Sequence, residues 1–206
     1  KGMKLAVLEK LDDWTKVMTE DGYIGYVRNS KLGESYQETA SREFEEPVYT
    51  SIRRNHKINL VWHQITSMES NDSLLNDIAG MKGVNVISPT WFSIISNDGE
   101  ISSLVSETYV TNAHAQGLEV WALVDNFNEA IDTKTVLASS ASREKLANQL
   151  VAAAVQYSLD GINIDFEAIP EEAADGYIQF IREISVKKNK NGIVLSIDNP
   201  VPMPYT

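Results

Sequence analysis

The sequence of 206 residues contains no cysteine. This absence excludes disulfide scaffolds, thiol nucleophiles and cysteine-ligated zinc sites. The three histidines, His56, His63 and His114, stand far apart without metal-ligand spacing, so we expect no metal site. No window approaches the roughly 20 apolar residues that cross a bilayer. We therefore expect no membrane-spanning helix.

Basic residues are also scarce. Lys and Arg number 18 against 29 Asp and Glu, which gives a formal net charge of -11. Nucleic acids and anionic membrane surfaces are bound through clustered cations, so the charge argues against both as partners. No secretory signal is recognisable, although the sequence opens at Lys1-Gly2 in what looks like the middle of a motif. Cysteine absence is common among secreted bacterial proteins but does not set a compartment.

Residues 1–35 have the pattern of short strands and turns. Leu5–Leu8 is a compact apolar run, and Asp21-Gly22 is a hairpin signal, since glycine supplies the positive φ of tight turns. The string Trp14-x-x-Val17 followed by Gly22-x-x-Gly25-Tyr26-Val27 resembles the second half of bacterial Src-homology-3-like domains. This resemblance implies a partial β domain of that kind. Residues 36–57 are polar and charged, and we interpret them as a linker.

Residues 58–206 alternate between predicted strands and helices. The apolar runs are Ile58–Ile65, Val84–Ile87, Leu118–Val124, Gly161–Phe166 and Ile193–Ile197. Helical patterns begin at Asn71-Asp72, at Leu104 (to Gln116), at Ser142 (to Tyr157) and near Pro170 (ending before Gly192). Repeated βα units with Val/Ile-rich strands predict an α/β fold with a parallel sheet.

The ends of the strands favour a barrel over a doubly wound sheet. Polar or aromatic residues follow nearly every strand, whereas doubly wound sheets concentrate them at one switch point. There is also no Gly-rich phosphate loop after the first strand. We predict a (β/α)8 TIM-barrel type of fold. It is apparently incomplete, because about five βα units are recognisable and a full barrel takes roughly 250 residues.

The stretch Asp160–Glu167 carries the chemistry. Side chains alternate along a strand, so Asn163, Asp165 and Glu167 are expected to point into the barrel, toward its mouth. Two residues span roughly 6.6 Å along a strand. Most glycosidases place two carboxylates on opposite sides of the scissile bond, which two side chains of one strand cannot do easily. Like charge at this range should raise one of the two pKa values.

This stretch resembles the strand signature Asp-x-x-Asp-x-Asp-x-Glu of family-18 glycoside hydrolases, and matches it at Asp160, Gly161, Asp165 and Glu167. The resemblance implies that Glu167 is the general acid and then the base. It also implies that Asp165 orients the N-acetyl group of the substrate, whose carbonyl oxygen is the nucleophile. Hydrolysis would then be substrate-assisted and retaining, with no cofactor. Asp160, at the strand start, is expected to cap or brace the site.

One departure from the signature is Asn163, which stands where the family usually has Asp. It resembles the branch that contains bacterial spore- and cell-wall-lytic members, as do Val61-Trp62, Pro89–Phe92 and Ser196–Asn199. We expect Asn163 to leave Asp165 more persistently ionised. The branch implies a polysaccharide partner, with peptidoglycan favoured over chitin and endo or exo action left open. It also implies an extracellular location, or one associated with the bacterial cell wall or spore.

Three further residues are candidates for substrate binding. Trp91 could stack on a sugar ring or be a core aromatic. Asn126 and Asn199 are chosen by their position after a strand. The alternative function is a non-catalytic, lectin-like glycan-binding barrel, since family-18 barrels that lack the acid bind without cutting. The presence of Glu167 favours the enzyme. A third class, an oxidoreductase or phosphate-sugar enzyme, would need cofactor motifs that the sequence lacks.

Overall fold

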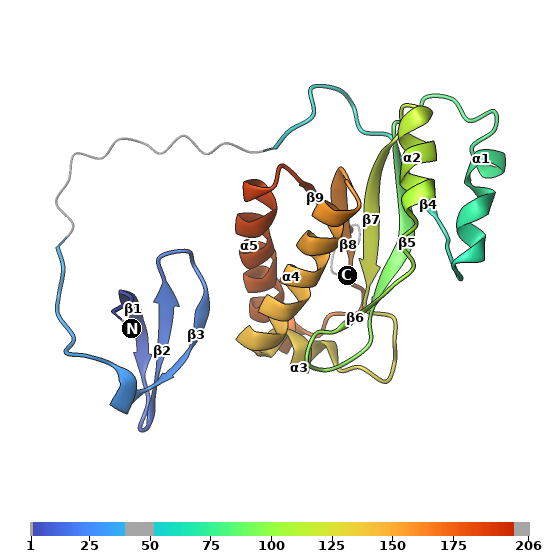
Figure 1. Cartoon of the computed structure of the whole chain (residues 1–206). Coiled ribbons are helices and arrows are strands. Elements are labelled where there is room, and N and C mark those ends of the chain that lie inside the picture. The colour runs from blue at the N-terminus through green and yellow to red at the C-terminus, as the bar shows by residue number, and fades with distance from the viewer. Residues whose placement is uncertain (1, 40–51, 200–206) are drawn as a thin grey trace, which may run out of the picture. The chain divides into compact units, whose positions relative to one another are not determined.

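The structure is a computed structural model that describes residues 2–39 and 52–199. The chain divides into two compact units, residues 1–51 and 52–206. Each is described by itself below, with the element labels of Figure 1. Part of the predicted linker, residues 40–51, lies outside the described residues.

The first unit is a three-stranded antiparallel sheet in the order β1-β2-β3. Its strands are β1 (Leu5–Lys10), β2 (Trp14–Thr19) and β3 (Ile24–Arg28), followed by a 3-10 turn η1 (Asn29–Lys31). Gly22 takes a φ of +89° in the β2–β3 turn, as the hairpin signal predicts. Thr15 and Val17 are the buried side chains of its described part. The short strands match the prediction, while the likeness to a Src-homology-3-like domain stays a prediction.

The second unit is built on five parallel strands. They are β4 (Leu60–His63), β5 (Val86–Ile94), β7 (Glu119–Asp125), β8 (Gly161–Asp165) and β9 (Val194–Ile197). A short strand, β6 (Ile101–Ser103), pairs antiparallel with the end of β5. The sheet order β4-β5-β7-β8-β9 follows the chain without a reversal. A doubly wound sheet reverses at its switch point, so the observed order favours the barrel type of topology.

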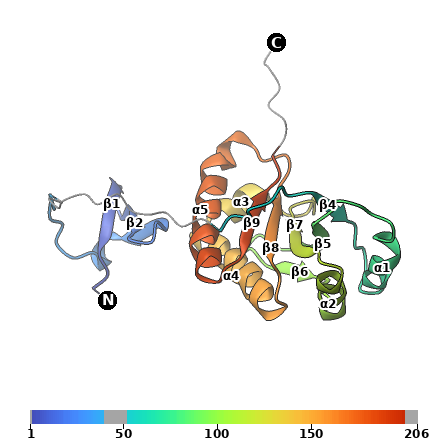
Figure 2. The ribbon, with the colours of Figure 1, turned by 90° about the horizontal axis from the view of Figure 1, so that it is seen from above.

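Helices connect the strands and pack against one face of the sheet. They are η2 (Glu69–Ser73), α1 (Leu74–Asp77), α2 (Glu107–Ala115), α3 (Thr133–Ala138), α4 (Ser140–Gln156), η3 (Glu171–Ala173) and α5 (Ala174–Lys190). Figures 1 and 2 show α4 and α5 packed together beside β8 and β9. The first predicted helix begins within η2 and continues as the short helix α1, and neither α3 nor β6 was predicted.

The two faces of the sheet carry different side chains. Ile162 and Ile164 of β8 lie in the main core with side chains of α2, α4 and α5. On the opposite, inner face a smaller cluster contains Val86, Trp121 and Val194 from three strands. A Cβ on Gly161 would lie 2.7 Å from the Trp121 indole, so glycine is needed there for the indole to cross β8.

A buried ion pair joins three of the helices. Arg143 of α4 donates to both carboxylate oxygens of Glu183 of α5, each at 3.1 Å, and to the carbonyl of Leu137 of α3 at 2.7 Å. The amide of Gln179 donates to the same carboxylate at 3.0 Å. Gly176 lets α5 approach α3 closely, because a Cβ there would lie 2.7 Å from the Leu137 carbonyl oxygen. These contacts fix α3 against the two longer helices.

Candidate active site

Three carboxylates from adjacent strands converge at the carboxyl end of the sheet. Asp125 ends β7 and Asp165 ends β8, and the two are partners in register. Asp198 follows β9, and its backbone N–H donates to the carbonyl of Ile164 at 2.9 Å. The parity of each strand places all three on the inner face, on the same side as Trp121. Glu167 follows β8 two residues beyond Asp165.

The pKa of Asp165 is raised to about 6. Burial is the main cause, followed by the negative charges of Asp198, Glu167 and Asp125. This value belongs to the protein with Asn at position 163, so the expectation that Asn163 leaves Asp165 more persistently ionised than the family's usual Asp would stays a prediction. Even with Asn in place of Asp at position 163, Asp165 still lies near like charges, because the neighbouring strands supply Asp125 and Asp198.

Asn163 is fully buried and hydrogen-bonded at both ends of its amide. Its Nδ2 donates to Oδ2 of Asp198 at 2.7 Å, and its Oδ1 accepts from Oγ of Ser196 at 2.5 Å. A buried amide is costly unless it is paired in this way. Asn163 therefore orients Asp198, a carboxylate that sequence reasoning passed over in favour of its neighbour Asn199.

Asp125 was also missed by sequence reasoning. Its Oδ2 accepts from Oγ of Ser93 at 2.8 Å, and its Oδ1 accepts from the backbone N–H of Phe127 at 3.1 Å. The carboxylate is largely buried, and these two donors compensate for its lost hydration. A polar side chain that ends a buried strand, as Asp125 does, was the available signal.

Glu167 is exposed, and its peptide is held by Asn126. The Glu167 N–H donates to Oδ1 of Asn126 at 2.8 Å, and the Asn126 Nδ2 donates to the Glu167 carbonyl at 2.9 Å. The same Nδ2 donates to Oγ1 of Thr133 at 3.0 Å. Both amide protons of Asn126 are thus already used inside the protein. Ala168 follows with a φ of +50°, a left-handed conformation that is uncommon for a residue with a Cβ.

Asp160 lies at the opposite end of β8 from this cluster. Its Oδ2 accepts from the backbone N–H of Val120 and from Nε2 of His114, each at 2.8 Å. Asp160 therefore ties the start of β8 to β7 and to the end of α2. These contacts brace the start of the strand, and a role of Asp160 in the site itself stays a prediction.

Trp91 is not placed to stack on a sugar. Its side chain is 1% exposed, its Nε1 donates to Oδ1 of Asn71 at 2.8 Å, and its ring meets Tyr109 edge-on at a centroid distance of 4.9 Å. The core interpretation is the correct one, and stacking on substrate is wrong. Asn199 lies exposed after β9, and its role in substrate binding stays a prediction.

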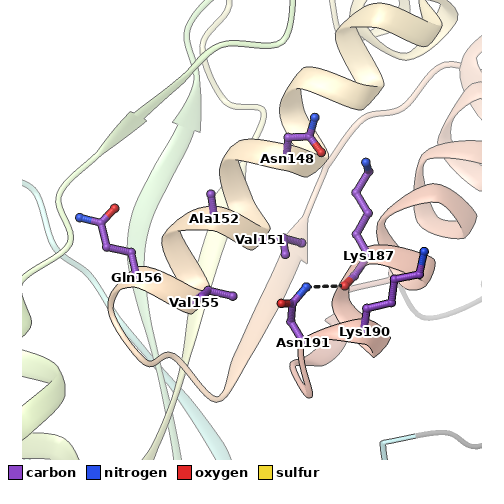
Figure 3. A pocket seen from close by; sticks show the side chains of 8 residues that line it. All are labelled: Asn148, Val151, Ala152, Val155, Gln156, Lys187, Lys190 and Asn191. Carbon is purple, nitrogen blue, oxygen red and sulfur yellow. Dashed lines mark hydrogen bonds between the residues drawn. The ribbon is translucent and has the colours of Figure 1, made fainter.

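A hollow of about 690 Å³ lies elsewhere, between α4 and α5 (Figure 3). Its lining residues are Asn148, Val151, Ala152, Val155, Gln156, Lys187, Lys190 and Asn191. It contains no carboxylate and lies on the helix side of the sheet, so it cannot perform the chemistry of the Asp165 cluster. Among residues 2–39 and 52–199, no group of three or more His, Asp and Glu is arranged to hold a metal ion.

Within those same ranges, none of the helices combines the length and the apolar composition that crossing a bilayer requires.

The chain is similar in sequence to one protein family and to a protein of Bacillus subtilis. The sequence model of glycosyl hydrolases family 18 matches residues 91–204. A protein of Bacillus subtilis (strain 168) described as uncharacterized glycosylase YvbX is 29% identical over 123 residues, which cover 57% of this chain and 36% of that protein.

Two solved structures show the likeness of the fold. The C-terminal domain of a putative chitinase from Desulfitobacterium hafniense DCB-2 superposes with a TM-score of 0.60 at 22% identity, over 69% of this chain and 46% of that one. The Bacillus cereus spore cortex-lytic enzyme SleL superposes with a TM-score of 0.57 at 19% identity, over 67% of this chain and 34% of that one. The chain thus spans less than half the length of these relatives.

Proposed function

The chain belongs to family 18 of the glycosyl hydrolases, and on this premise we propose that the protein hydrolyses glycans containing β-linked N-acetylglucosamine. The observation that carries the proposal is the one-sided cluster of carboxylates. Asp125, Asp165 and Asp198 line the inner face of three adjacent strands, and Glu167 follows the middle one. Such a cluster favours a mechanism in which the nucleophile comes from the substrate.

In the proposed reaction Glu167 acts first as an acid. Its exposed position beside the cluster allows it to protonate the oxygen of the leaving sugar, while the carbonyl oxygen of the 2-acetamido group attacks the anomeric carbon. The bond from that carbon to the leaving oxygen breaks as the ring of an oxazolinium ion closes. Glu167, now a carboxylate, takes a proton from the incoming water as the water oxygen bonds to the anomeric carbon. The bond from that carbon to the acetamido oxygen breaks, which restores the acetamido group, and the configuration of the anomeric carbon is retained.

Asp165 has the electrostatic role in this proposal. Burial and three like charges raise its pKa to about 6, so its carboxylate is a stronger base than an ordinary aspartate. It accepts the N–H of the acetamido group and holds the carbonyl oxygen toward the anomeric carbon. The positive charge of the oxazolinium ion relieves the repulsion among Asp125, Asp165 and Asp198, and the cluster therefore stabilises the intermediate more than the substrate.

Peptidoglycan is the favoured polymer, with chitin as the alternative. The preference rests on Asn163, the departure that resembles the lytic branch of the family. The structural relatives include one described as a putative chitinase and one described as a spore cortex-lytic enzyme, so both polymers belong in any test. Action on peptidoglycan places the protein outside the cell or in the bacterial wall or spore, which we propose as its location.

The test compares wild type, Glu167→Gln and the control Glu171→Gln in the complete gene product, with purified peptidoglycan and chitooligosaccharides as substrates. Mass spectrometry should find products ending in reducing N-acetylglucosamine. Glu167→Gln should lower the rate by about 100-fold to 10,000-fold, the usual range for loss of a general acid, and leave binding intact. Glu171, an exposed carboxylate four residues further on, should be replaceable without effect. A wild type that binds these glycans and cuts none would instead support the lectin-like alternative.

A further inference from the structure

The peptide of Glu167 is held by a side chain and not by the sheet. Strand β8 ends at Asp165, so Glu167 lies beyond the ladder that its neighbours share. Asn126, the residue that follows β7, takes the place of a strand partner there. Its amide accepts from the N–H and donates to the carbonyl of Glu167, at 2.8 and 2.9 Å.

Asn126 is itself held in place from the other side. Its Nδ2 also donates to Oγ1 of Thr133, the first residue of α3, at 3.0 Å. The side chain of Asp132 caps that helix by accepting from the Lys134 N–H at 3.1 Å. Through the Leu137 carbonyl and Arg143, α3 is fixed to α4 and α5. The clamp on Glu167 is therefore anchored in the helical layer.

The conformation after Glu167 shows why such a clamp is needed. Ala168 has a φ of +50°, which a residue with a Cβ adopts only when surrounding contacts compensate for it. Neither the sheet ladder nor the preferred backbone geometry sets the direction of the chain at Glu167. The contacts to the amide of Asn126 do so instead.

Resting on the proposed function, we propose that Asn126 is a positioning residue that aims the Glu167 carboxyl at the glycosidic oxygen. Thr133 supports it by fixing the rotamer of the amide. This replaces the sequence-based assignment of Asn126 to substrate binding. Both of its N–H donors are already used within the protein, which leaves none for a sugar hydroxyl.

The experiment uses four variants of the complete gene product. Asn126→Ala removes the clamp, Thr133→Val removes its support, Thr133→Ser restores the hydroxyl, and Asn128→Ala is the control. Asn128 lies in the same loop, and its side chain accepts only from the Ala130 N–H among the hydrogen bonds of the described residues, at 3.1 Å. For each variant kcat and KM are measured on the polymer that wild type cuts, peptidoglycan or chitooligosaccharides, together with hydrogen exchange of the Glu167 amide by NMR.

Asn126→Ala should lower kcat on the order of 100-fold, the cost of misplacing a reacting group by about 1 Å. KM should change less than about 3-fold, because no sugar contact is lost. Thr133→Val should lower kcat about 3-fold to 10-fold, the worth of one hydrogen bond, and Thr133→Ser should restore it. Exchange of the Glu167 amide should accelerate in Asn126→Ala and remain as in wild type in Asn128→Ala.

A fifth variant tests how close the side chain at position 126 lies to the acid. Asn126→Asp keeps an oxygen that accepts from the Glu167 N–H, but it places a second oxygen and a negative charge against the Glu167 carbonyl. The alkaline limb of the pH–rate profile should move to higher pH, because added negative charge disfavours ionisation of nearby acids. An unmoved limb would mean that the side chain at position 126 does not lie near the acid, which would overturn the positioning role.

The outcomes discriminate between the two proposals. An Asn126→Ala variant with faster amide exchange but an unchanged kcat would overturn the positioning role. A rise in KM with unchanged kcat would overturn it in favour of sugar binding. If wild type cuts neither polymer, the proposed function fails, and with it the positioning role, while amide exchange still decides whether the clamp holds Glu167.

Discussion

Asp165 should weaken the fold at neutral pH, and replacing it should therefore stabilise the protein. Its pKa is raised from 3.8 to about 6 by burial and by three neighbouring carboxylates. The folded state then binds the proton more tightly than the unfolded state does. Stability that is present below about pH 4 is lost as the pH rises through about 6, because above that value the folded protein holds an unfavourable charge.

The size of the effect follows from the difference between the two pKa values. That difference is about 2 pH units, and each unit corresponds to about 1.36 kcal/mol, which gives about 3 kcal/mol in the absence of solvent screening. The Asp165 side chain is partly exposed, and screening reduces the figure to about 1–1.5 kcal/mol. Asp165→Asn keeps the shape and removes the charge. It should gain that amount at pH 7 and almost nothing at pH 4.

Urea unfolding followed by far-UV circular dichroism measures this gain, since the α-helices of the described residues all belong to the second unit. The control is Glu172→Gln, which removes an exposed carboxylate a few residues beyond β8 and should change stability by less than about 0.5 kcal/mol. An Asp165→Asn variant less stable than wild type at pH 7, or equally stabilised at pH 4 and 7, would refute the reasoning.

Two further substitutions test the scaffold beneath the site. Glu183→Gln removes the carboxylate that pairs with the buried Arg143 guanidinium and should cost about 3–5 kcal/mol in urea unfolding. The double variant Arg143→Met with Glu183→Leu should recover most of that loss, and an equal loss in both would contradict the explanation. Gly161→Ala pushes a Cβ to within 2.7 Å of the Trp121 indole and should cost about 1–3 kcal/mol by overpacking. Gly33→Ala, whose Cβ would meet nothing within 4 Å, is its control, and equal effects of the two would rule out the steric cause.

The sequence predicted the sheet well because burial on both faces leaves a clear apolar run. Four of the five parallel strands fall within one residue of the predicted runs, whereas β5 shares only Val86 and Ile87 with its run and extends to Ile94. The short elements were missed for a physical reason. Helix α3 has only 6 residues, too few to show helical periodicity, and β6 has 3 residues and depends on pairing with β5.

The site was predictable only along one strand. Alternation placed Asp165 on the inner face, but the approach of Asp125 and Asp198 depends on the register between strands, which no single segment reveals. Trp91 was misplaced because the predicted strand ended at Ile87, whereas β5 continues to Ile94 and contains Trp91. A register shift between Thr90 and Phe92 also breaks the alternation there, and both Trp91 and Phe92 enter the main core.

The order of the strands in the sheet bears on how the protein forms during synthesis. Because β4, β5, β7, β8 and β9 pair in the order in which the ribosome makes them, each new strand finds its neighbour already exposed as an edge. During synthesis the N-terminal parts of a protein fold first, and among the described residues each of these strands pairs with the parallel strand that is made next. Asp198, which follows β9, is the last of the three aspartates to be made. The mutual repulsion of the three carboxylates is therefore complete only after all five parallel strands have been made.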